Sequence, residues 1–210
     1  MKCYFVRHGK TEWNLEGRFQ GATGDSPLLK ESYEELKQLG QALKSIPFDA
    51  VYSSDLKRAV DTTAIIIDQF DEKVETIYSE DLREWQLGKL EGAKIATMKA
   101  IYPGQMTAFR HNLAKFNAGQ FGAESIYQTT SRVKKLIKTF ESKDYENVLI
   151  VGHGANLTAS IRTLLGFEPA LLRSLGGLDN ASLSVLETDD FDHFKCLVWN
   201  NKSYLENHVD

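Results

Sequence analysis

Three short apolar runs along the chain have the pattern of strands buried inside a sheet. They cover residues 3–6, 50–52 and 148–151, and each is bounded by glycine, serine or charged positions. Continuous apolar runs of this length are typical of strands that are covered on both faces. We therefore predict that all three are central strands.

Helical periodicity fills the stretches between these runs. Apolar side chains recur every three or four positions, which is the spacing of an amphipathic helix. This spacing predicts four helices, across residues 29–46, 56–67, 126–140 and 157–165. The alternation of strands with helices predicts an α/β fold, a three-layer sandwich with a mostly parallel central sheet and helices on both faces.

Two other parts of the chain have a different pattern. Residues 182–186 and 194–199 flank a short acidic turn, which predicts a hairpin at the sheet edge. Residues 88–122 contain Pro103, several glycines and only weak helical spacing, so we interpret them as an inserted lid over a site. A length of 210 residues suits one domain, residues 1–210, with a single large core.

The charge balance and the cysteines narrow the range of functions. The chain has 25 Lys and Arg against 29 Asp and Glu, and this formal charge of −4 argues against a nucleic-acid partner. No apolar stretch reaches transmembrane length and the apolar start is too short for a signal peptide, so we expect no membrane partner and a cytoplasmic location. Cys3 and Cys196 lack metal-binding spacing and are expected to be free thiols.

Polar groups follow each of the three predicted strands, at positions that suit phosphate. They are Arg7-His8-Gly9, the run 53–58 that ends in Arg58, and Gly152-His153-Gly154. In an α/β sheet the carboxyl ends of the strands meet at one edge, where ligands bind, so we expect these groups to converge.

Two helix starts are expected to help bind an anion there. Ser54 is a candidate N-cap for the helix that carries Arg58, and His153 directly precedes another helix. Guanidinium groups add charge-assisted hydrogen bonds to phosphate worth about 1.5–3 kcal/mol each. The expected site therefore needs neither a metal nor another cofactor, and we predict none.

Longer motifs around these groups resemble the histidine phosphatase superfamily, which includes the cofactor-dependent phosphoglycerate mutases. The motifs occur in the family's order and are spread over most of the chain. They are residues 7–14, 17–21, 25–28, 53–59, 82–92, 152–154 and 180–182. The resemblance implies an enzyme that forms a phosphohistidine.

The resemblance also implies a role for each candidate catalytic residue. His8 would be the nucleophile, attacking phosphorus through a neutral ring nitrogen. Arg7, Arg58 and His153 would hold the phosphoryl oxygens. Glu84 would protonate the leaving group and later accept a proton from the attacking water.

Three further residues match substrate-binding positions of the family. Asn14 would supply a neutral hydrogen bond, and Gln20 and Gly21 would line the pocket. The chain departs from the family pattern at Lys10, where Glu or Gln is usual, and at Leu29, where Thr is common. Lys10 is a candidate for the positive rim of the site or a surface residue without a role.

The segment between Glu84 and His153 bears on the choice between phosphatase and mutase. It is shorter than in the family mutases and lacks their adjacent arginine pair, to which Arg110-His111 is the nearest counterpart. We therefore predict a metal-independent phosphatase acting on small phosphomonoesters, with a phosphoglycerate mutase as the alternative. A binding module that has lost its chemistry is the third hypothesis. The expected partner is a small phosphorylated metabolite.

The predicted lid leaves several questions open. Its cations are candidate substrate contacts or solvated charges: Lys94, Lys99, Arg110 and Lys115. Its large apolar side chains either form a pocket wall or pack the lid: Met106, Phe109, Phe116 and Phe121. The remaining histidines are expected to be structural or exposed: His111, His193 and His208. No pattern in the sequence indicates the oligomeric state.

Overall fold

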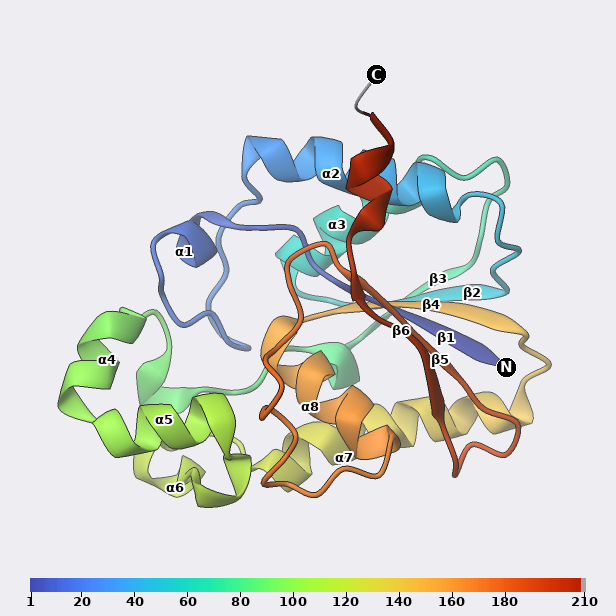
Figure 1. Ribbon diagram of the computed structural model, residues 1–210. Helices are drawn as coiled ribbons and strands as arrows, with labels where there is room; N and C mark the ends of the chain where they lie inside the picture. The colour runs from blue at the N-terminus through green and yellow to red at the C-terminus, as the bar shows by residue number, and fades with distance from the viewer. Residues whose placement is uncertain (209–210) are drawn as a thin grey trace.

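The sheet at the centre of the computed structural model is mixed but mostly parallel (Figure 1). Residues 1–208 are described, and their six strands pair in the order β3-β2-β4-β1-β5-β6. The strands are β1 (Lys2–Arg7), β2 (Ala50–Ser54), β3 (Thr76–Ser79), β4 (Asn147–Gly152), β5 (Leu183–Glu187) and β6 (Lys195–Asn201). The first four are mutually parallel, whereas β5 and β6 form the antiparallel hairpin predicted at the edge.

Helices cover both faces of this sheet, which confirms the predicted fold class. In Figure 1, α2 and α3 lie on one face and α7 and α8 on the other. The α-helices are α1 (Glu12–Leu15), α2 (Lys30–Leu43), α3 (Lys57–Ile67), α4 (Ile95–Ile101), α5 (Pro103–His111), α6 (Ala118–Phe121), α7 (Ile126–Lys138) and α8 (Gly154–Leu164). Short 3-10 turns lie at Glu80–Leu82, Gly88–Leu90, Leu113–Lys115, Thr139–Ser142 and Ser203–His208.

Each face of the sheet has its own apolar core, because alternate strand side chains point to opposite faces. Phe5 and Ile150 pack with the cluster that includes apolar side chains of α7 and α8. Val6 and Val151, their neighbours in sequence, pack with side chains of α2 and α3. Because helices cover these strands on both faces, the strand sequences are continuous apolar runs.

Residues 88–122 fold into α4, α5, α6 and two 3-10 turns beside the carboxyl edge of the sheet (Figure 1). A third apolar cluster lies beneath them and includes Trp85, Met106, Phe109 and Phe121. Ala159 of α8 belongs to the same cluster, so this helical segment packs directly against the sheet's covering layer.

Strand β3 was not predicted from the sequence. It lies at the sheet edge, and its four residues are partly or fully exposed, so they lack the apolar run of the other parallel strands. Cys3 and Cys196 are free, as expected, with Cys3 buried and Cys196 partly buried. Among the described helices, none has the length and apolar character needed to cross a membrane.

We predict that Phe140→Ala destabilises the protein by about 3–5 kcal/mol, because its ring is fully buried and lies 4.7 Å from the Tyr52 ring. Chemical unfolding measured by circular dichroism would give the change. Tyr127→Ala is the matched control, since Tyr127 is 68% exposed on α7 and its loss is expected to cost less than about 0.5 kcal/mol. Equal unfolding midpoints for the two variants would contradict this view of the core.

Candidate active site

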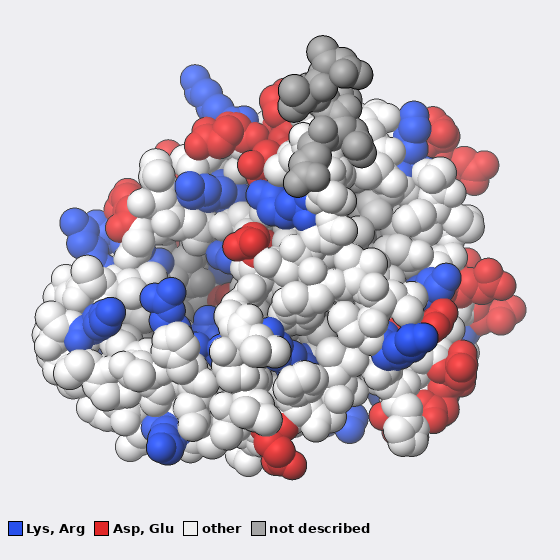
Figure 2. Space-filling model, viewed as in Figure 1, with Lys and Arg blue, Asp and Glu red and all other residues white. Residues whose placement is uncertain are grey.

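A cavity of about 580 Å³ opens at the carboxyl ends of β1 and β4. Residues that directly follow these two strands form one of its walls, and the helical segment 88–122 contributes another. In the space-filling view, Lys and Arg side chains surround the hollow between α1 and the helices α4 and α5 (Figure 2). The position matches the sheet edge at which the sequence predicted a site.

His8 stands at the end of β1 and is only 3% exposed. Its Nδ1 donates a hydrogen bond of 2.7 Å to the Gly9 carbonyl, which leaves Nε2 without a proton in the neutral ring. Burial, and then the charges of Arg58 and Arg7, hold the pKa of His8 well below 6.5. The imidazole is therefore neutral near pH 7 and carries its lone pair on Nε2.

The main chain around His8 is fixed from both sides. Gly9 N–H donates to Thr62 Oγ1 on α3 at 3.0 Å, and Asn180 Nδ2 donates to the His8 carbonyl at 3.1 Å. A Cβ at Gly9 would lie 2.9 Å from Leu36 Cδ1 and 3.1 Å from Ser32 Cβ, so this loop packs closely against α2.

His153 follows β4 and lies beside His8, with 5.2 Å between the two ring centroids. Its Nε2 is 2.8 Å from Ser54 Oγ, whereas its buried Nδ1 has no partner within the described residues. Burial is the main reason that the pKa of His153 is well below 6.5, and Arg58, His8 and Arg7 lower it further.

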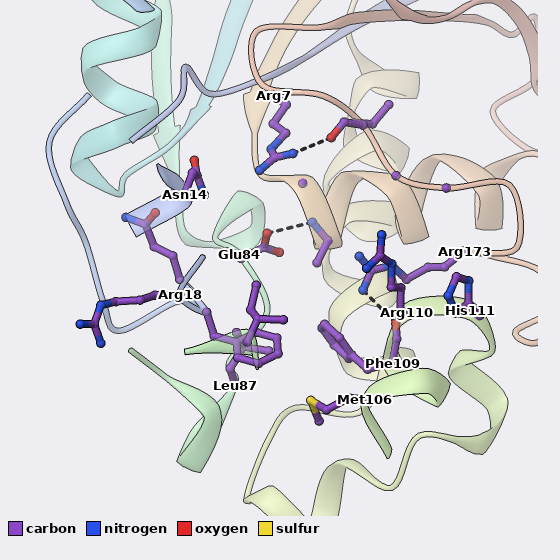
Figure 3. Close-up of a pocket in the computed structure, with 18 of the residues that line it drawn as sticks. Arg7, Asn14, Arg18, Glu84, Leu87, Met106, Phe109, Arg110, His111 and Arg173 are labelled. Carbon is purple, nitrogen blue, oxygen red and sulfur yellow. Dashed lines mark hydrogen bonds between the residues drawn. The ribbon is translucent and has the colours of Figure 1, made fainter. Parts of the chain in front are cut away.

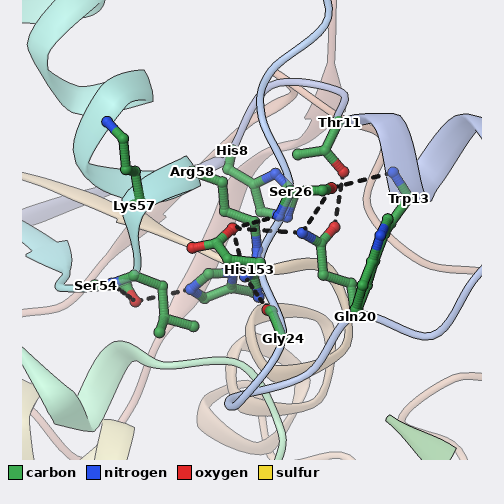
Figure 4. A network of polar contacts seen from close by, with 12 residues as sticks. His8, Thr11, Trp13, Gln20, Gly24, Ser26, Ser54, Lys57, Arg58 and His153 are labelled. Atoms are coloured by element: carbon green, nitrogen blue, oxygen red, sulfur yellow. Dashed lines mark hydrogen bonds and ion pairs between the residues drawn. The ribbon is translucent and has the colours of Figure 1, made fainter. Parts of the chain in front are cut away.

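Arg58 lies in the first turn of α3, with its side chain enclosed by the loop that follows α1 (Figure 4). One terminal nitrogen donates to the Gly24 carbonyl at 2.9 Å and to Asp25 Oδ1 at 3.1 Å, and the other donates to the Gly21 carbonyl at 2.9 Å. Its Nε is buried without a partner within the described residues. The loop therefore holds the guanidinium group next to the two histidines.

The predicted N-cap of this helix was wrong. Leu56 is the N-cap, and it makes no side-chain capping bond. Ser54 Oγ accepts from Leu56 N–H at 3.3 Å and is also the partner of His153. Asp55 and Leu56 separate Ser54 from the helix, so its hydroxyl orients the histidine instead of capping α3.

Arg7 projects from the end of β1 into the cavity (Figure 3). It donates to the Leu178 carbonyl at 2.6 Å, and its Nε is buried without a partner within the described residues. A Cβ at Gly154 would lie 2.8 Å from Arg7 Cζ, so the absence of a side chain there lets the guanidinium lie against the start of α8.

Glu84 is only 6% exposed, and its carboxylate is held by three main-chain donors. Its Oε1 accepts from the N–H groups of Trp85 at 2.9 Å and Asn156 at 2.7 Å, and Oε2 accepts from Ala155 N–H at 2.9 Å. Oε1 thus has both lone pairs occupied, whereas Oε2 keeps one free beside the cavity.

These bonds correct the expectation that the start of α8 is left open for a bound anion. The Ala155 and Asn156 amides belong to the first turn of α8, and the anion that they bind is the Glu84 carboxylate of the protein itself. Figure 3 shows Glu84 pointing to this helix start from the opposite wall of the cavity.

Asn14, which was predicted to supply a hydrogen bond to the substrate, lines the cavity. Its Oδ1 accepts hydrogen bonds from Thr11 N–H at 3.2 Å and from Asn180 Nδ2 at 3.1 Å. With the oxygen oriented in this way, the amide nitrogen is the group left to meet a ligand.

Gln20 also lines the cavity, but its amide is already bonded within the protein. Its oxygen accepts from Thr11 Oγ1 at 2.7 Å and its nitrogen donates to Ser26 Oγ at 3.1 Å (Figure 4). Gly21 is not a lining residue. Its N–H donates to Glu91 Oε1 at 2.6 Å and its carbonyl accepts from Arg58, so it positions the arginine.

The structure distributes the predicted lid residues among different environments. Lys99 and Arg110 line the cavity, whereas Lys94, Lys115 and Lys10 do not. Met106 and Phe109 are both buried and part of the cavity wall, while Phe121 is buried and stacks on Phe116 at 5.8 Å, away from the cavity. All four apolar side chains thus pack in the cluster beneath this segment, and Met106 and Phe109 also form part of the cavity wall.

The remaining histidines also differ. His193 is exposed, as expected, and His111 is exposed but lines the cavity, which was not expected. The side chain of His208 lies outside the described residues. Within residues 1–208, no group of three or more His, Cys, Asp or Glu is arranged to hold a metal ion.

Two functional features escaped the reading of the sequence. Glu91 accepts from Gly21 N–H and Gly24 N–H at 2.6 and 3.1 Å and so supports the loop around Arg58. Arg173, in the connection between α8 and β5, lines the cavity. Glu91 belongs to one of the quoted motifs, whereas nothing in the local pattern distinguishes Arg173.

A sequence profile of the histidine phosphatase superfamily (branch 1) matches residues 3–202. The chain belongs to this superfamily. The similar superfamily members include enzymes with different named activities. The 2,3-bisphosphoglycerate-dependent phosphoglycerate mutase of Cytophaga hutchinsonii is 35% identical over 169 residues, 78% of this chain and 77% of the relative.

Phosphatases are also among the similar members of the histidine phosphatase superfamily. Phosphoserine phosphatase 1 of Hydrogenobacter thermophilus is 30% identical over 192 residues, 90% of this chain and 88% of the relative. The structure of the mycobacterial glucosyl-3-phosphoglycerate phosphatase complexed with VO3 is 27% identical, with a TM-score of 0.84 over 95% of this chain and 98% of its own. The family is therefore established, and the comparisons leave the choice of reaction within it open.

We predict that the two buried histidines make the protein less stable to unfolding below pH 6.5. Their pKa values are lowered in the folded state, so the unfolded chain binds protons first as the pH falls through 6.5. Each histidine then removes about 1.4 kcal/mol of stability per pH unit until its folded form also titrates. Urea unfolding at a series of pH values measures this slope.

The variant His8→Gln separates this effect from that of the carboxylates. It is expected to remove about one proton from the pH dependence of the unfolding free energy, since glutamine does not titrate. A slope identical to that of the unmodified protein would show that His8 is not buried in its neutral form.

Proposed function

We propose that the protein is a metal-independent phosphatase that hydrolyses small phosphomonoesters through a phosphohistidine on His8. The observation that carries this proposal is the neutral Nε2 lone pair of His8, fixed by the bond from Nδ1 to the Gly9 carbonyl, beside the guanidinium groups of Arg7 and Arg58. A neutral imidazole is a nucleophile at pH 7, and the adjacent cations attract the phosphate dianion.

Three buried donors that have no partner among the described residues support the position of the phosphoryl group. They are Arg7 Nε, Arg58 Nε and His153 Nδ1 when this nitrogen carries the proton. An unsatisfied buried donor costs about 1–3 kcal/mol, and phosphoryl oxygens would satisfy all three. A phosphoryl group held here would face His8 from the cavity side.

In the first step, His8 Nε2 forms a bond to phosphorus while the bond from phosphorus to the ester oxygen breaks. Protonated Glu84 gives its proton, from Oε2, to the leaving oxygen, and the alcohol departs through the cavity. Guanidinium groups stabilise the charge that spreads over the three phosphoryl oxygens in the transition state, the task that metal ions perform in other phosphoryl-transfer enzymes.

In the second step, water attacks phosphorus and gives a proton to the Glu84 carboxylate. The bond from phosphorus to Nε2 breaks, its electron pair returns to the ring, and inorganic phosphate leaves with His8 neutral again. Three main-chain donors fix Glu84 throughout, so the same carboxyl group can serve both steps.

A phosphoglycerate mutase is the second candidate, favoured by the similarity to the Cytophaga hutchinsonii enzyme. A mutase must protect the phosphohistidine from water until the phosphoryl group returns to the substrate. We favour hydrolysis because the cavity of about 580 Å³ is much larger than a phosphoglycerate requires and leaves room for water beside His8.

We expect the protein to hydrolyse p-nitrophenyl phosphate in the presence of EDTA, between about pH 5 and pH 8. The variant His8→Ala should lose at least about 10³-fold in kcat/KM, because no other group at the site can form the covalent intermediate. Acid quenching is avoided, and the phosphoenzyme is detected by intact-protein mass after alkaline quenching. The matched control is His193→Ala, an exposed histidine away from the cavity.

Three outcomes of these assays would overturn the proposal. They are an absence of turnover, turnover that depends on added metal, and interconversion of 3- and 2-phosphoglycerate that is faster than phosphate release. The last result would identify the mutase, since the phosphoryl group would then return to the substrate and not pass to water.

We expect Glu84→Gln to distinguish substrates by their leaving groups. A p-nitrophenolate ion leaves without a proton, so the variant's loss in kcat on p-nitrophenyl phosphate should stay below about 10-fold. The loss in kcat on an alkyl phosphate should reach about 10²–10⁴-fold, because the alkoxide needs a proton to leave. The two substrates share the phosphate site, which makes each the control for the other. An equal loss in kcat on both would assign Glu84 a structural role through its bonds to α8.

A further inference from the structure

The general acid of the proposed reaction lies in a stretch of chain without regular secondary structure. Residues 84–87 follow the 3-10 turn Glu80–Leu82 and belong to no helix or strand. Main-chain groups in such a stretch have no regular partners, so each buried one needs a hydrogen bond from elsewhere in the protein. The bonds that this stretch receives therefore decide where the Glu84 carboxyl group lies.

Arg132 of α7 supplies two of these bonds. Its Nη1 donates to the Asp81 carbonyl at 2.6 Å, and its Nη2 donates to the Glu84 carbonyl at 3.1 Å. One guanidinium group thus fixes both the chain that precedes the acid and the main chain of the acid itself. Helix α7 contacts the turn Glu80–Leu82, so the arginine reaches both carbonyls from a regular element.

Glu124 orients the Arg132 guanidinium group. Its Oε1 accepts from Nε at 3.0 Å and its Oε2 accepts from Nη2 at 3.2 Å, and two such bonds fix the plane of the group. The Arg132 and Glu124 side chains are only 18% and 14% exposed. Burial raises the pKa of Glu124, but the hydrogen bonds and charge of Arg132 outweigh it and hold the pKa below its usual value. The carboxylate is therefore ionised at neutral pH and balances the arginine.

Glu124 also binds the two residues that follow the acid. Its N–H donates to the Gln86 carbonyl at 2.8 Å, and its Oε2 accepts from Gln86 N–H at 3.2 Å. Its carbonyl accepts from Trp85 Nε1 at 2.5 Å. Trp85 N–H is in turn one of the donors that hold the Glu84 carboxylate. Arg132 and Glu124 together thus hold the chain on both sides of Glu84.

Neither Arg132 nor Glu124 lines the cavity, so neither touches a substrate bound there. All the nitrogens of the Arg132 guanidinium group donate to groups of the protein. The hydrogen bonds of Arg132 are therefore directed to the chain that carries Glu84 and not to a ligand.

Glu84 needs such support because its charge changes in the proposed reaction. As a carboxylate it accepts charge-assisted bonds from the N–H groups of Trp85, Ala155 and Asn156. Hydrogen bonds to a charged group are roughly twice as strong as bonds to a neutral one, so these bonds weaken whenever the carboxyl group carries the proton. The bond from Arg132 does not depend on that proton, because it ends on the main-chain carbonyl of Glu84.

We propose that Arg132, oriented by Glu124, is a positioning residue that keeps the Glu84 carboxyl group beside the leaving oxygen in both of its protonation states. This inference rests on the proposed phosphatase activity and adds two residues outside the cavity to the proton transfer. It also connects that transfer to the helical segment 88–122, because Glu124 follows the end of this segment.

The variant Arg132→Met tests this role through the leaving group. A misplaced acid should lower kcat on an alkyl phosphate, glycerol 3-phosphate, by about 10- to 100-fold. The value of kcat on p-nitrophenyl phosphate should stay within about threefold, because that leaving group needs no proton. Arg132→Lys should restore part of the loss, since lysine returns a charged donor without the planar fork.

Lys138→Met is the matched control for the loss of a cation from α7. Lys138 lies on the same helix and is also ion-paired, but its partners are Glu141 and Asp192, which lie outside the stretch around Glu84. We expect kcat to stay within about twofold of the unmodified protein on both substrates.

A double variant distinguishes positioning from a general loss of stability. Once Glu84→Gln has removed the acid, its position no longer matters. The combination with Arg132→Met should therefore lose no more kcat on glycerol 3-phosphate than Glu84→Gln alone. Three results would overturn the inference: unchanged kcat in Arg132→Met, equal losses on the two substrates, or losses that multiply in the double variant. If Arg132→Met does not fold, Glu124→Gln gives the same test with an expected loss of about 3- to 10-fold on glycerol 3-phosphate, because it keeps the main-chain bonds of Glu124.

Amide hydrogen exchange measured by NMR gives a readout that does not depend on activity. The Ala155 and Asn156 amides bind the Glu84 carboxylate, whereas the Leu157 amide binds a main-chain carbonyl and is the internal reference. In Arg132→Met the first two should exchange about 10-fold faster, with Leu157 unchanged. If the unmodified protein hydrolyses no ester, the proposed phosphatase fails, and this exchange still decides whether Arg132 positions Glu84. Equal exchange rates in the variant and the unmodified protein would then overturn the inference.

Discussion

The buried guanidinium group of Arg58 and the half-buried one of Arg7 lie beside two buried imidazoles at the carboxyl edge of the sheet, and the site depends on how these cations are stabilised there. Burying an unpartnered cation is costly, and burying two together adds repulsion. Main-chain carbonyls supply most of the partners: Leu178 for Arg7, and Gly21 and Gly24 for Arg58. Carbonyl dipoles satisfy the donors without cancelling the charge, so a positive field remains. Burial is the main reason that the two histidines stay neutral, and this field adds to it.

The loop around Arg58 must adopt one conformation to place these carbonyls against the guanidinium group. Glu91 binds the N–H groups of Gly21 and Gly24, so the carbonyls of the same two residues are held against the guanidinium. A Cβ at Gly24 would lie 2.5 Å from the Trp13 ring, and one at Gly21 would lie 2.5 Å from the Trp85 carbonyl. Both positions therefore require glycine because of close packing, and the 82–92 motif supports the arginine as well as carrying Glu84.

The sequence predicts the parts of this site that follow strands and misses the parts held by irregular chain. His8 and His153 were found because apolar runs mark β1 and β4, and the strand ends of a parallel sheet meet. Arg173 was missed because a bond to a carbonyl, such as that of Phe109, can be made to any residue type and leaves no pattern. The capping role given to Ser54 failed because the same hydroxyl was needed by His153.

The start of α8 explains why the proposed phosphate site is built from side chains. In many phosphate-binding proteins the free N–H groups of a helix start hold the anion. Here Ala155 and Asn156 hold Glu84 instead, and Gly154 makes room for Arg7, so three consecutive residues place the acid and a cation relative to each other. Rigid support of this kind suits a site whose groups must keep their geometry through two steps. Because the helix amides are occupied, the charge on the transferring phosphoryl group in the proposed reaction would be met by guanidinium and imidazole groups.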